Sequence, residues 1–287
     1  MKQHSNCLQR FLFEEQHIRG EWVHLTETWQ QAKAYQNLNS AVENQLGQAL
    51  AAVALLSATI KFEGSMILQI EGNGALQTLV AQANHLGKIR GLARSSDDII
   101  AGSLAQMMGQ GRLVLTIETG NPKPYQGVVL LDGHSLAATL ETYFRQSEQL
   151  PTRLWLVANS TQAAGLLLQT IPSHADNEKN LSEWQTIEYL ANTLSEIELL
   201  NLDCESLLHR LFHQYPLRLF AAESIEFACH CSREKTQASL LTLGIEELIE
   251  LAQKQEMITV DCQFCGQSYA FNQTDIQSLI QNNMKHH

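Results

Sequence analysis

Two pairs of closely spaced cysteines near the end of the 287-residue chain constrain its fold more than any other feature. Cys229 and Cys231 stand in FACHCSRE, and Cys262 and Cys265 stand in DCQFCGQSY. Pairs at such spacings let two short loops present four sulfurs to one tetrahedral zinc ion. The Cys-x-Cys pair is unusual in a structural zinc site, because its two sulfurs are also near enough to oxidise with each other. The sequence therefore predicts a site that holds either a metal ion or disulfides, depending on the redox state.

The composition predicts a soluble protein with room for a sizeable core. Apolar residues make up 44% of the chain, whose length is sufficient for two domains. The longest strictly apolar run, residues 49–56, is far shorter than the roughly 20 residues that span a bilayer. The N-terminal residues have no apolar segment of the kind found in signal peptides. We therefore expect a cytoplasmic protein without a membrane partner, in which cysteines favour metal or redox chemistry over a disulfide framework.

The net charge of −11 is distributed unevenly along the chain. Residues 1–175 are almost neutral, whereas residues 176–226 carry 3 basic and 10 acidic side chains, and residues 227–287 carry 4 and 7. Proteins that bind nucleic acids use Lys and Arg to displace counterions from phosphates. This balance argues against a nucleic-acid partner. It fits a solvated acidic region, or one that meets cationic or unfolded partners.

Residues 1–175 have the pattern of a mixed domain of sheets and helices. Helices are expected over 39–62 and 135–150, the second of them capped by Ser135. Strands are expected over 65–71, 112–119, 125–131 and 153–158. Strands that follow one another closely predict an antiparallel sheet with helices packed against it. The expected fold class is therefore α+β.

Residues 176–226 have the pattern of an amphipathic, helical middle region, preceded by a linker at 172–180. One long helix is expected from a capping box of Ser182 and Gln185, and a second between Asp203 and Pro216. The apolar side of the long helix carries residues at helical spacing: Trp184, Ile187, Leu190, Leu194 and Ile197. The region is too small to form a core alone, so this side must pack on another part of the protein.

Residues 227–287 are expected to form a small domain that depends on its metal. One or two strands are expected over 217–227, and helices over 245–257 and 274–284, the last with a capping box of Thr274 and Gln277. About 60 residues rarely form a stable core unaided, and structural zinc contributes roughly 10–16 kcal/mol in small peptides. Loss of the metal should therefore unfold this domain.

The redox chemistry of the four cysteines leaves more than one interpretation open. Zinc holds thiols as thiolates, which oxidants attack, and a sulfenic acid formed on one would be trapped by its near neighbour. A disulfide across one intervening residue is strained and readily reduced, which favours a reversible switch. A constitutive zinc-ribbon interaction module without switching stays open on spacing alone. A thioredoxin-like oxidoreductase is disfavoured, because Cys265 precedes GQSYAF, a strand pattern where a helix would be needed.

Other motifs do not assemble a catalytic site, so we expect no catalytic residues and no enzyme. Gly72 and Gly74 lack the third Gly of a dinucleotide-binding loop and instead predict a hairpin turn. His209 and His213 lack the adjacent Glu of an HExxH metalloprotease, and we expect both on the surface. His230, between the first two cysteines, is expected to point away from the metal, because four thiolates already satisfy zinc.

Several segments resemble the redox-regulated heat-shock protein 33 chaperone family, the 33 kDa chaperonins. IRGEWVHL, YQGVVLL, SLAATLETYFRQSEQLPT and GLLLQTIP resemble its N-terminal domain. FACHCSREK, GIEELIEL and DCQFCGQSYAF resemble its redox domain. The resemblance covers nearly the whole chain, and the Cys-x-Cys with the distant Cys-x-x-Cys is its most specific element.

The resemblance implies an ATP-independent holdase of the bacterial cytoplasm that serves in the stress response. It would be inactive while reduced, with one Zn²⁺ on the four cysteines. Oxidation would form the disulfides Cys229–Cys231 and Cys262–Cys265 and release zinc. The middle region would then be destabilised, and a homodimer would form on activation. The active form would then bind unfolding and oxidatively damaged client proteins and prevent their aggregation.

Two questions about further residues arise from the chain itself. We hypothesise that the apolar stripe Trp184, Ile187, Leu190, Leu194 and Ile197 contributes to client capture after it is released. The alternative is that the stripe only faces the core and that its release alone matters. Cys7 and Cys204 lie outside the four-cysteine motif and are expected to be ordinary buried or surface thiols.

Overall fold

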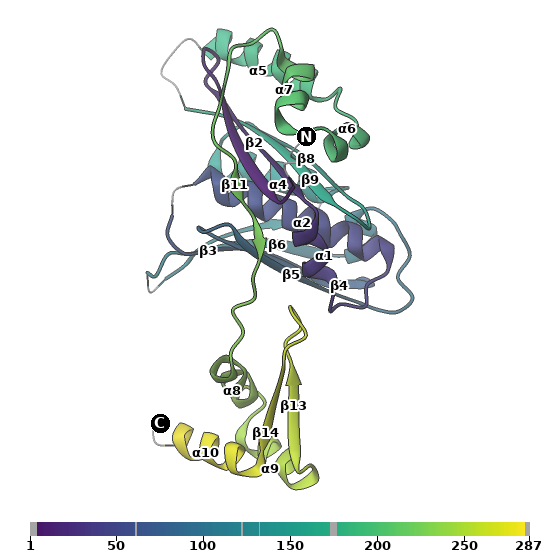
Figure 1. Cartoon of the computed structure of the whole chain (residues 1–287), viewed down its shortest axis with the longest axis vertical. Coiled ribbons are helices and arrows are strands. Elements are labelled where there is room, and N and C mark those ends of the chain that lie inside the picture. Colours follow the sequence, from purple (N-terminus) through teal and green to yellow (C-terminus); the bar gives the residue numbers. More distant parts are fainter. Residues whose placement is uncertain (1–4, 61, 122, 132, 173–176, 285–287) are drawn as a thin grey trace. The chain divides into compact units, whose positions relative to one another are not determined.

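The computed structural model describes residues 5–60, 62–121, 123–131, 133–172 and 177–284. The chain divides into two compact units, Met1–Ala228 and Cys229–His287 (Figure 1). The fold is α+β, as the sequence predicts. Part of the expected linker, residues 173–176, lies outside the described residues, and the residues after it begin a helix.

One sheet of the first unit is antiparallel at every described strand pair. Its strand order is β10-β1-β2-β9-β8, with β11 also paired to β1. The strands are β1 (Cys7–Phe13), β2 (Ile18–Leu25), β8 (Thr152–Ala158), β9 (Ala163–Thr170), β10 (Leu217–Leu219) and β11 (Glu223–Ser224). The register places His24 of β2 between Cys7 of β1 and Ala164 of β9.

The second sheet has the strand order β12-β5-β4-β3-β6-β7. Its strands are β3 (Ser65–Gly72), β4 (Leu76–Asn84), β5 (Lys88–Ser95), β6 (Gly111–Glu118), β7 (Tyr125–Leu130) and β12 (Glu226–Phe227). Only the short pair of β12 with β5 is parallel within the described residues. The hairpin turn expected at Gly72 and Gly74 is confirmed between β3 and β4, and β6 and β7 also form an antiparallel pair.

The long helix α2 (Ser40–Thr59) lies between the two sheets and fills the main core (Figure 1). Asn39 caps it, because its side chain accepts a hydrogen bond from the Val42 N–H at 3.0 Å. The apolar run at residues 49–56 is at most 1% exposed. A helix covered by sheets on two sides needs apolar residues around most of its circumference, which explains the uninterrupted run.

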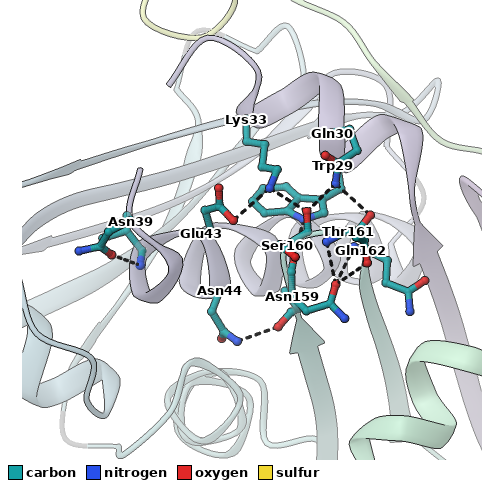
Figure 2. A network of polar contacts seen from close by, with 12 residues as sticks. Trp29, Gln30, Lys33, Asn39, Glu43, Asn44, Asn159, Ser160, Thr161 and Gln162 are labelled. Atoms are coloured by element: carbon teal, nitrogen blue, oxygen red, sulfur yellow. Dashed lines mark hydrogen bonds and ion pairs between the residues drawn. The ribbon is translucent and has the colours of Figure 1, made fainter. Parts of the chain in front are cut away.

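Side chains of two helices hold the turn between β8 and β9 in place (Figure 2). The Trp29 indole N–H of α1 (Glu27–Lys33) donates to the Asn159 carbonyl at 2.8 Å, and Lys33 Nζ donates to the Ser160 carbonyl at 2.7 Å. From α2, the Asn44 amide donates to the Ala158 carbonyl at 2.7 Å. These bonds satisfy carbonyls at the end of a hairpin and fasten one end of the first sheet to α1 and α2.

Three short helical segments of the first unit lie between β5 and β8 in the sequence. They are α3 (Leu104–Met108), α4 (Leu136–Tyr143) and the π-helix η1 (Phe144–Glu148). Ser135 caps α4 as predicted, accepting from the Ala138 N–H at 3.2 Å. The α-helix expected to continue to residue 150 ends at Tyr143, because the chain changes there to π-helical hydrogen bonding.

Three middle helices cover the face of the first sheet that points away from α2 (Figure 1). They are α5 (Asn177–Ala191), α6 (Glu196–Asn201) and α7 (Cys204–Phe212). The strands contribute buried aromatic and aliphatic side chains to this contact: Phe11, Phe13, Trp22, Leu166 and Leu168. An ion pair of 3.2 Å between Arg153 of β8 and Glu188 of α5 adds a polar link.

The single long helix expected from Ser182 is wrong. Helix α5 begins before Ser182 and ends at Ala191, and α6 starts a new helix. The capping box belongs to Ser195 and Glu198, whose side chains each accept a hydrogen bond from the other's backbone N–H, at 3.3 Å and 2.9 Å. A Ser followed three residues later by Glu is a strong start signal, and it interrupts the helical spacing of the stripe.

The second unit is a hairpin flanked by helices. It contains α8 (Arg233–Leu241), α9 (Ile245–Lys254), β13 (Met257–Asp261), β14 (Ser268–Asn272) and α10 (Gln273–Met284). Its core is small and consists of five buried apolar side chains with partly buried neighbours: Leu240, Leu248, Ile258, Phe271 and Ile276.

Sequence patterns near the C-terminus place several boundaries wrongly. Residues 217–227 form three short strands, β10 to β12, in place of one or two, because each pairs with a different stretch of the first unit. The capping box of α10 is formed by Asn272 and Asp275, at 2.8 Å and 3.0 Å, in place of Thr274 and Gln277. Helix α9 ends before residue 257 because strand β13 begins there.

Candidate metal centre

The four cysteines of the two spaced pairs lie together in the second unit. Cys229 and Cys231 precede α8, and Cys262 and Cys265 lie in the turn between β13 and β14. Their sulfurs all lie within 4.8 Å of one another, and each side chain is half-buried. The closest sulfurs belong to different pairs: Cys229 to Cys262 at 3.6 Å and Cys231 to Cys265 at 3.5 Å.

The backbone of the β13–β14 turn directs its two sulfurs to one side. The N–H groups of Cys265 and Gly266 both donate to the Cys262 carbonyl, at 3.2 Å and 2.7 Å, and the Cys262 N–H donates to the Gln267 carbonyl at 2.9 Å. Gly266 has a φ of 70°, which glycine adopts without strain. This compact knuckle explains why a Cys-x-x-Cys followed by Gly suits a metal site.

The loop with Cys229 and Cys231 is fixed through α8. Ser232 caps this helix by accepting from the Lys235 N–H at 3.3 Å, and Lys235 Nζ donates to the His230 carbonyl at 2.8 Å. Arg233 donates to the Ala270 carbonyl of β14 at 2.7 Å, pairs with Asp275 of α10 at 2.9 Å, and lies 4.3 Å from the Phe271 ring centroid. These contacts join the two cysteine loops into one site.

The four adjacent thiols can all be ionised only when a cation is bound among them. Burial raises the pKa of Cys262, and the Cys229 thiol acts in the same direction while the Cys265 thiol acts in the opposite one. Burial, together with hydrogen bonds to the neighbouring thiols, raises the pKa of Cys265 to about 12. The hydroxyl of Tyr269 donates to the Cys231 sulfur at 3.2 Å, which raises the pKa of this tyrosine to about 12. Four adjacent thiols cannot all ionise unless positive charge balances them.

The arrangement fits a tetrahedral zinc ion. A Zn–S bond of roughly 2.3 Å places tetrahedral sulfurs about 3.8 Å apart. The closest sulfur–sulfur distances, 3.5 Å and 3.6 Å, are slightly shorter than this value. All the sulfur–sulfur distances in the set are within 4.8 Å, which is somewhat longer. Cys229, Cys231, Cys262 and Cys265 could therefore hold a metal ion, and their four-thiolate chemistry suits zinc.

Comparison with known proteins shows the family to which the chain belongs. The family model for the Hsp33 protein matches residues 6–272. The chain belongs to the Hsp33 family. Relatives named 33 kDa chaperonin include a protein of Nitrosococcus oceani that is 49% identical, over 97% of this chain and 95% of that protein. A 33 kDa chaperonin of Pseudomonas aeruginosa is 41% identical over 96% and 95%.

A solved member of the Hsp33 family has the same fold. The crystal structure of the 33 kDa chaperonin from Thermotoga maritima has a TM-score of 0.82 and 25% sequence identity, covering 98% of this chain and 99% of that one. The resemblance stated from sequence is confirmed, and the chain is a chaperone of this family. Among the described residues, no helix combines the length and apolar character needed to cross a membrane.

The stripe proposed for client capture is divided between different environments in this Hsp33-family chain. Trp184 and Ile187 of α5 are buried against the first sheet, at 6% and 0% exposed. Leu190 and Leu194 are partly buried at the edge of the same cluster. Ile197 lies on α6 and is 75% exposed.

The remaining sequence-predicted residues lie outside the four-sulfur cluster. His209 and His213 are exposed, as expected, and His230 is exposed as well. Cys7 and Cys204 are buried in the first unit.

Sequence reasoning about this Hsp33-family site missed the residues around the cysteines. Tyr269 and Arg233 touch the site or join its two loops, yet neither belongs to the cysteine motif. Tyr269 pairs with Val260 in the β13–β14 register, which places it beside the knuckle. The sequence does show an aromatic residue four positions after Cys265. Its position beside the metal centre could be recognised only once the β13–β14 register was known.

Proposed function

We propose that this chain is a redox-regulated, ATP-independent holdase that binds unfolding and oxidatively damaged proteins and prevents their aggregation. The observation that carries the proposal is the cluster of four sulfurs from two loops, with its closest contacts across the pairs. Such a cluster suits a metal in the reduced state, and each cysteine also has a near neighbour in sequence with which to form a disulfide.

The metal of the reduced state would be one Zn²⁺ on Cys229, Cys231, Cys262 and Cys265. When bound, zinc would hold the sulfurs as thiolates and supply folding free energy to a unit with few core residues. Oxidation to the disulfides Cys229–Cys231 and Cys262–Cys265 would remove all four ligands. The two loops would then no longer be joined through their sulfurs, and the second unit would unfold.

Activation would release the middle helices from the first sheet. The apolar contact between them has aromatic residues on both sides, so its separation would expose a large apolar surface. The acidic residues of this region would keep the released segment soluble. We assign client capture to this surface, with Trp184, Ile187, Leu190, Leu194 and Ile197 as candidate contacts.

The proposal includes three regions of the chain and a place of action in the cell. The N-terminal domain would be 1–175, the middle region 176–226 and the redox-switch domain 227–287. The protein would act in the cytoplasm during stress, without catalytic residues and without a nucleic-acid or membrane partner. A homodimer would form on activation.

Light scattering from a heat-unfolded client enzyme tests the proposal. The reduced, zinc-loaded chain and a sample treated with peroxide at mild heat are compared, with zinc release followed by a colorimetric chelator. Suppressed scattering only in the oxidised, zinc-free sample is the expected result. Zinc retention with no suppression would favour a constitutive zinc-ribbon interaction module. Catalytic reduction of insulin with a thiol donor would instead indicate an oxidoreductase.

A further inference from the structure

Two cysteines outside the candidate metal centre lie together in the first unit. Cys7 begins β1 and Cys204 begins α7, and their side chains are 7% and 1% exposed. Both belong to the apolar cluster between the first sheet and the middle helices. Burial raises the pKa of Cys204 above the usual thiol range, and charge on Cys7 raises it further. Both thiols are therefore buried in one cluster of side chains, between the first sheet and the middle helices.

The fold brings Cys7 and Cys204 to the same end of the sheet from distant parts of the sequence. Cys7 is the direct partner of His24 in the β1–β2 register. Nε2 of His24 lies 2.9 Å from the Leu200 carbonyl, near the end of α6. Asp203 then caps α7, accepting from the Ser206 N–H at 2.8 Å, which fixes Cys204 as the first helical residue.

A hollow of the first unit is lined in part by Cys204, whereas Cys7 is not among its lining residues. The hollow has a volume of about 540 Å³ and is lined by residues that include Gln9, Trp22, His24, Gln162 and Cys204. A water molecule occupies about 30 Å³ in the liquid, so the hollow has room for water and for a small peroxide. Of the two cysteines, Cys204 is the one that borders this hollow, and we assign the first reaction with an oxidant to it.

We propose that Cys7 and Cys204 form a second redox pair, whose disulfide fastens α7 to β1 and opposes release of the middle helices. The cross-link itself does not depend on the proposed function. Its effect on activation rests on that function, because it assumes that the middle helices must leave the sheet.

The oxidant would be hydrogen peroxide or an organic hydroperoxide. The Cys204 thiolate attacks one peroxide oxygen, the O–O bond breaks, and the departing hydroxide takes a proton to become water (an alcohol, for an organic hydroperoxide). The Cys7 thiolate then attacks the Cys204 sulfenic acid sulfur, and the hydroxide released takes the second thiol proton. Two thiols lose two electrons and two protons in total, hydrogen peroxide is reduced to two waters, and one S–S bond forms.

The surroundings of the pair make this reaction slow while the protein is folded. Burial raises the pKa of Cys7 to about 11, and Cys204 is shifted in the same direction. Most of both thiols is therefore protonated at neutral pH, and the thiolate is the reactive form. The pair would react more slowly than the half-buried cysteines of the second unit, and it would link those chains whose middle helices still lie on the sheet under sustained oxidation.

Such a cross-link would hold the middle region by closing a long loop. Joining residues that are far apart in sequence removes much of the chain entropy gained on opening. Helix α7 carries buried contacts to the sheet through Leu207, Leu211 and Phe212. A disulfide at its first residue would keep these side chains near their partners.

Peptide mapping of the oxidised full-length chain tests the pairing. After peroxide treatment and alkylation, trypsin should release the peptide of residues 3–10 joined to that of residues 180–210, because cleavage follows Lys and Arg. The linked species should accumulate more slowly than oxidation of Cys229, Cys231, Cys262 and Cys265. Cys7→Ala and Cys204→Ala should each abolish it. Recovery of both peptides unlinked, with the other four cysteines oxidised, would overturn the pairing.

The effect on activation is tested with the same variants. Limited proteolysis of residues 176–226 should be at least about tenfold slower in the cross-linked chain than in oxidised Cys204→Ala. Client capture per chain, measured by light scattering, should be at least about threefold lower. Cys7→Ala serves as a second variant that cannot link, in case either substitution alone perturbs packing.

The outcomes distinguish the proposed effect of the Cys7–Cys204 disulfide on activation from the holdase proposal. If the linked chain and both variants show equal rates of proteolysis and equal client capture, the disulfide does not oppose release of the middle helices. Failure of all oxidised samples to capture client would count against the proposed function, and mapping and proteolysis would still decide whether the pair forms and fastens α7.

Discussion

The hydroxyl of Tyr269 donates a hydrogen bond to the sulfur of Cys231 at an O–S distance of 3.2 Å. The tyrosine comes from β14 and the cysteine from the loop before α8, so the bond links the two halves of the candidate metal centre. A donated hydrogen bond withdraws charge from a thiolate sulfur and makes it a poorer nucleophile. It also orients the sulfur, as outer groups do at metal sites.

Replacing Tyr269 by Phe should therefore make the centre more sensitive to oxidation. We expect peroxide-driven oxidation of the zinc-loaded chain to accelerate about three- to tenfold, because one charge-assisted hydrogen bond is lost. The rate is measured from zinc release in excess peroxide. Tyr189→Phe, on an exposed tyrosine of α5, is the matched control and should leave the rate unchanged. Equal rates in Tyr269→Phe and wild type would contradict a role for the hydrogen bond.

The sequence predicts this site better than it predicts the first sheet. Four thiols at short spacings are sufficient to indicate a metal centre, because the spacing itself determines how the sulfurs can meet. Strands such as β3 are also predictable, since buried and partly exposed residues alternate along them. In β2 this alternation is lost, because one face packs on the main core and the other on the middle helices. A strand buried on both faces has no period-two signal.

What the sequence could not predict depends on contacts between distant segments. The helical spacing from Trp184 to Ile197 predicts one stripe, but the chain turns after Ala191 and begins a new helix after Ser195. A local pattern cannot show that Leu194 lies in a connection. The contacts of Arg233 with β14 and α10 likewise depend on how the second unit closes.

Two isoleucines of this stripe provide a comparison of a buried and an exposed position. Ile187 is fully buried, so Ile187→Ala should weaken docking of the middle helices by roughly 2–4 kcal/mol. The reduced chain should then suppress client aggregation without oxidation. Ile197→Ala, at a position 75% exposed, should change stability by less than about 0.5 kcal/mol. Light scattering with the reduced proteins checks both, with urea unfolding as the measure of stability.

The same pair tests whether the stripe touches clients directly. If Ile197 contacts clients, oxidised Ile197→Ala should capture less client per chain although its stability is unchanged. Unchanged capture by this variant would remove Ile197 from the contact surface and leave the buried residues. Inactivity of reduced Ile187→Ala, despite a measured loss of stability, would contradict release of the middle helices as the activating step.

Metal removal should unfold the second unit and leave the core of the first intact. Among its described residues, the second unit has five buried apolar side chains in its core, too few for independent stability. A chelator, or Cys262→Ser, should abolish slow hydrogen exchange in β13, β14 and α10. Amides of α2, in the separate main core, should keep their protection. Slow exchange in β13 and β14 of the metal-free chain would show that the cysteines are not needed to hold the unit together.

Glu21 makes the stability of the first unit depend on pH. It lies on β2, is 2% exposed, and its Oε2 has no hydrogen-bond partner among the described residues. Burial raises its pKa from 4.5 to about 7, although the charges of Arg19 and Arg10 act in the opposite direction. The folded state therefore binds a proton more tightly than the unfolded state. Stability should fall as pH rises from about 4.5 to about 7, by on the order of 2–3 kcal/mol.

Glu21→Gln should remove this dependence, because the amide stays neutral at every pH. At pH 8 the variant should be more stable than wild type, and at pH 5 the two should be nearly equal. Urea unfolding at both pH values, followed by the fluorescence of buried Trp22 and Trp29, measures the difference. Glu15→Gln, at an exposed position of the same unit, controls for the change in net charge. A wild-type chain equally stable at both pH values would mean that Glu21 remains ionised in the folded protein and that its neighbouring arginines outweigh its burial.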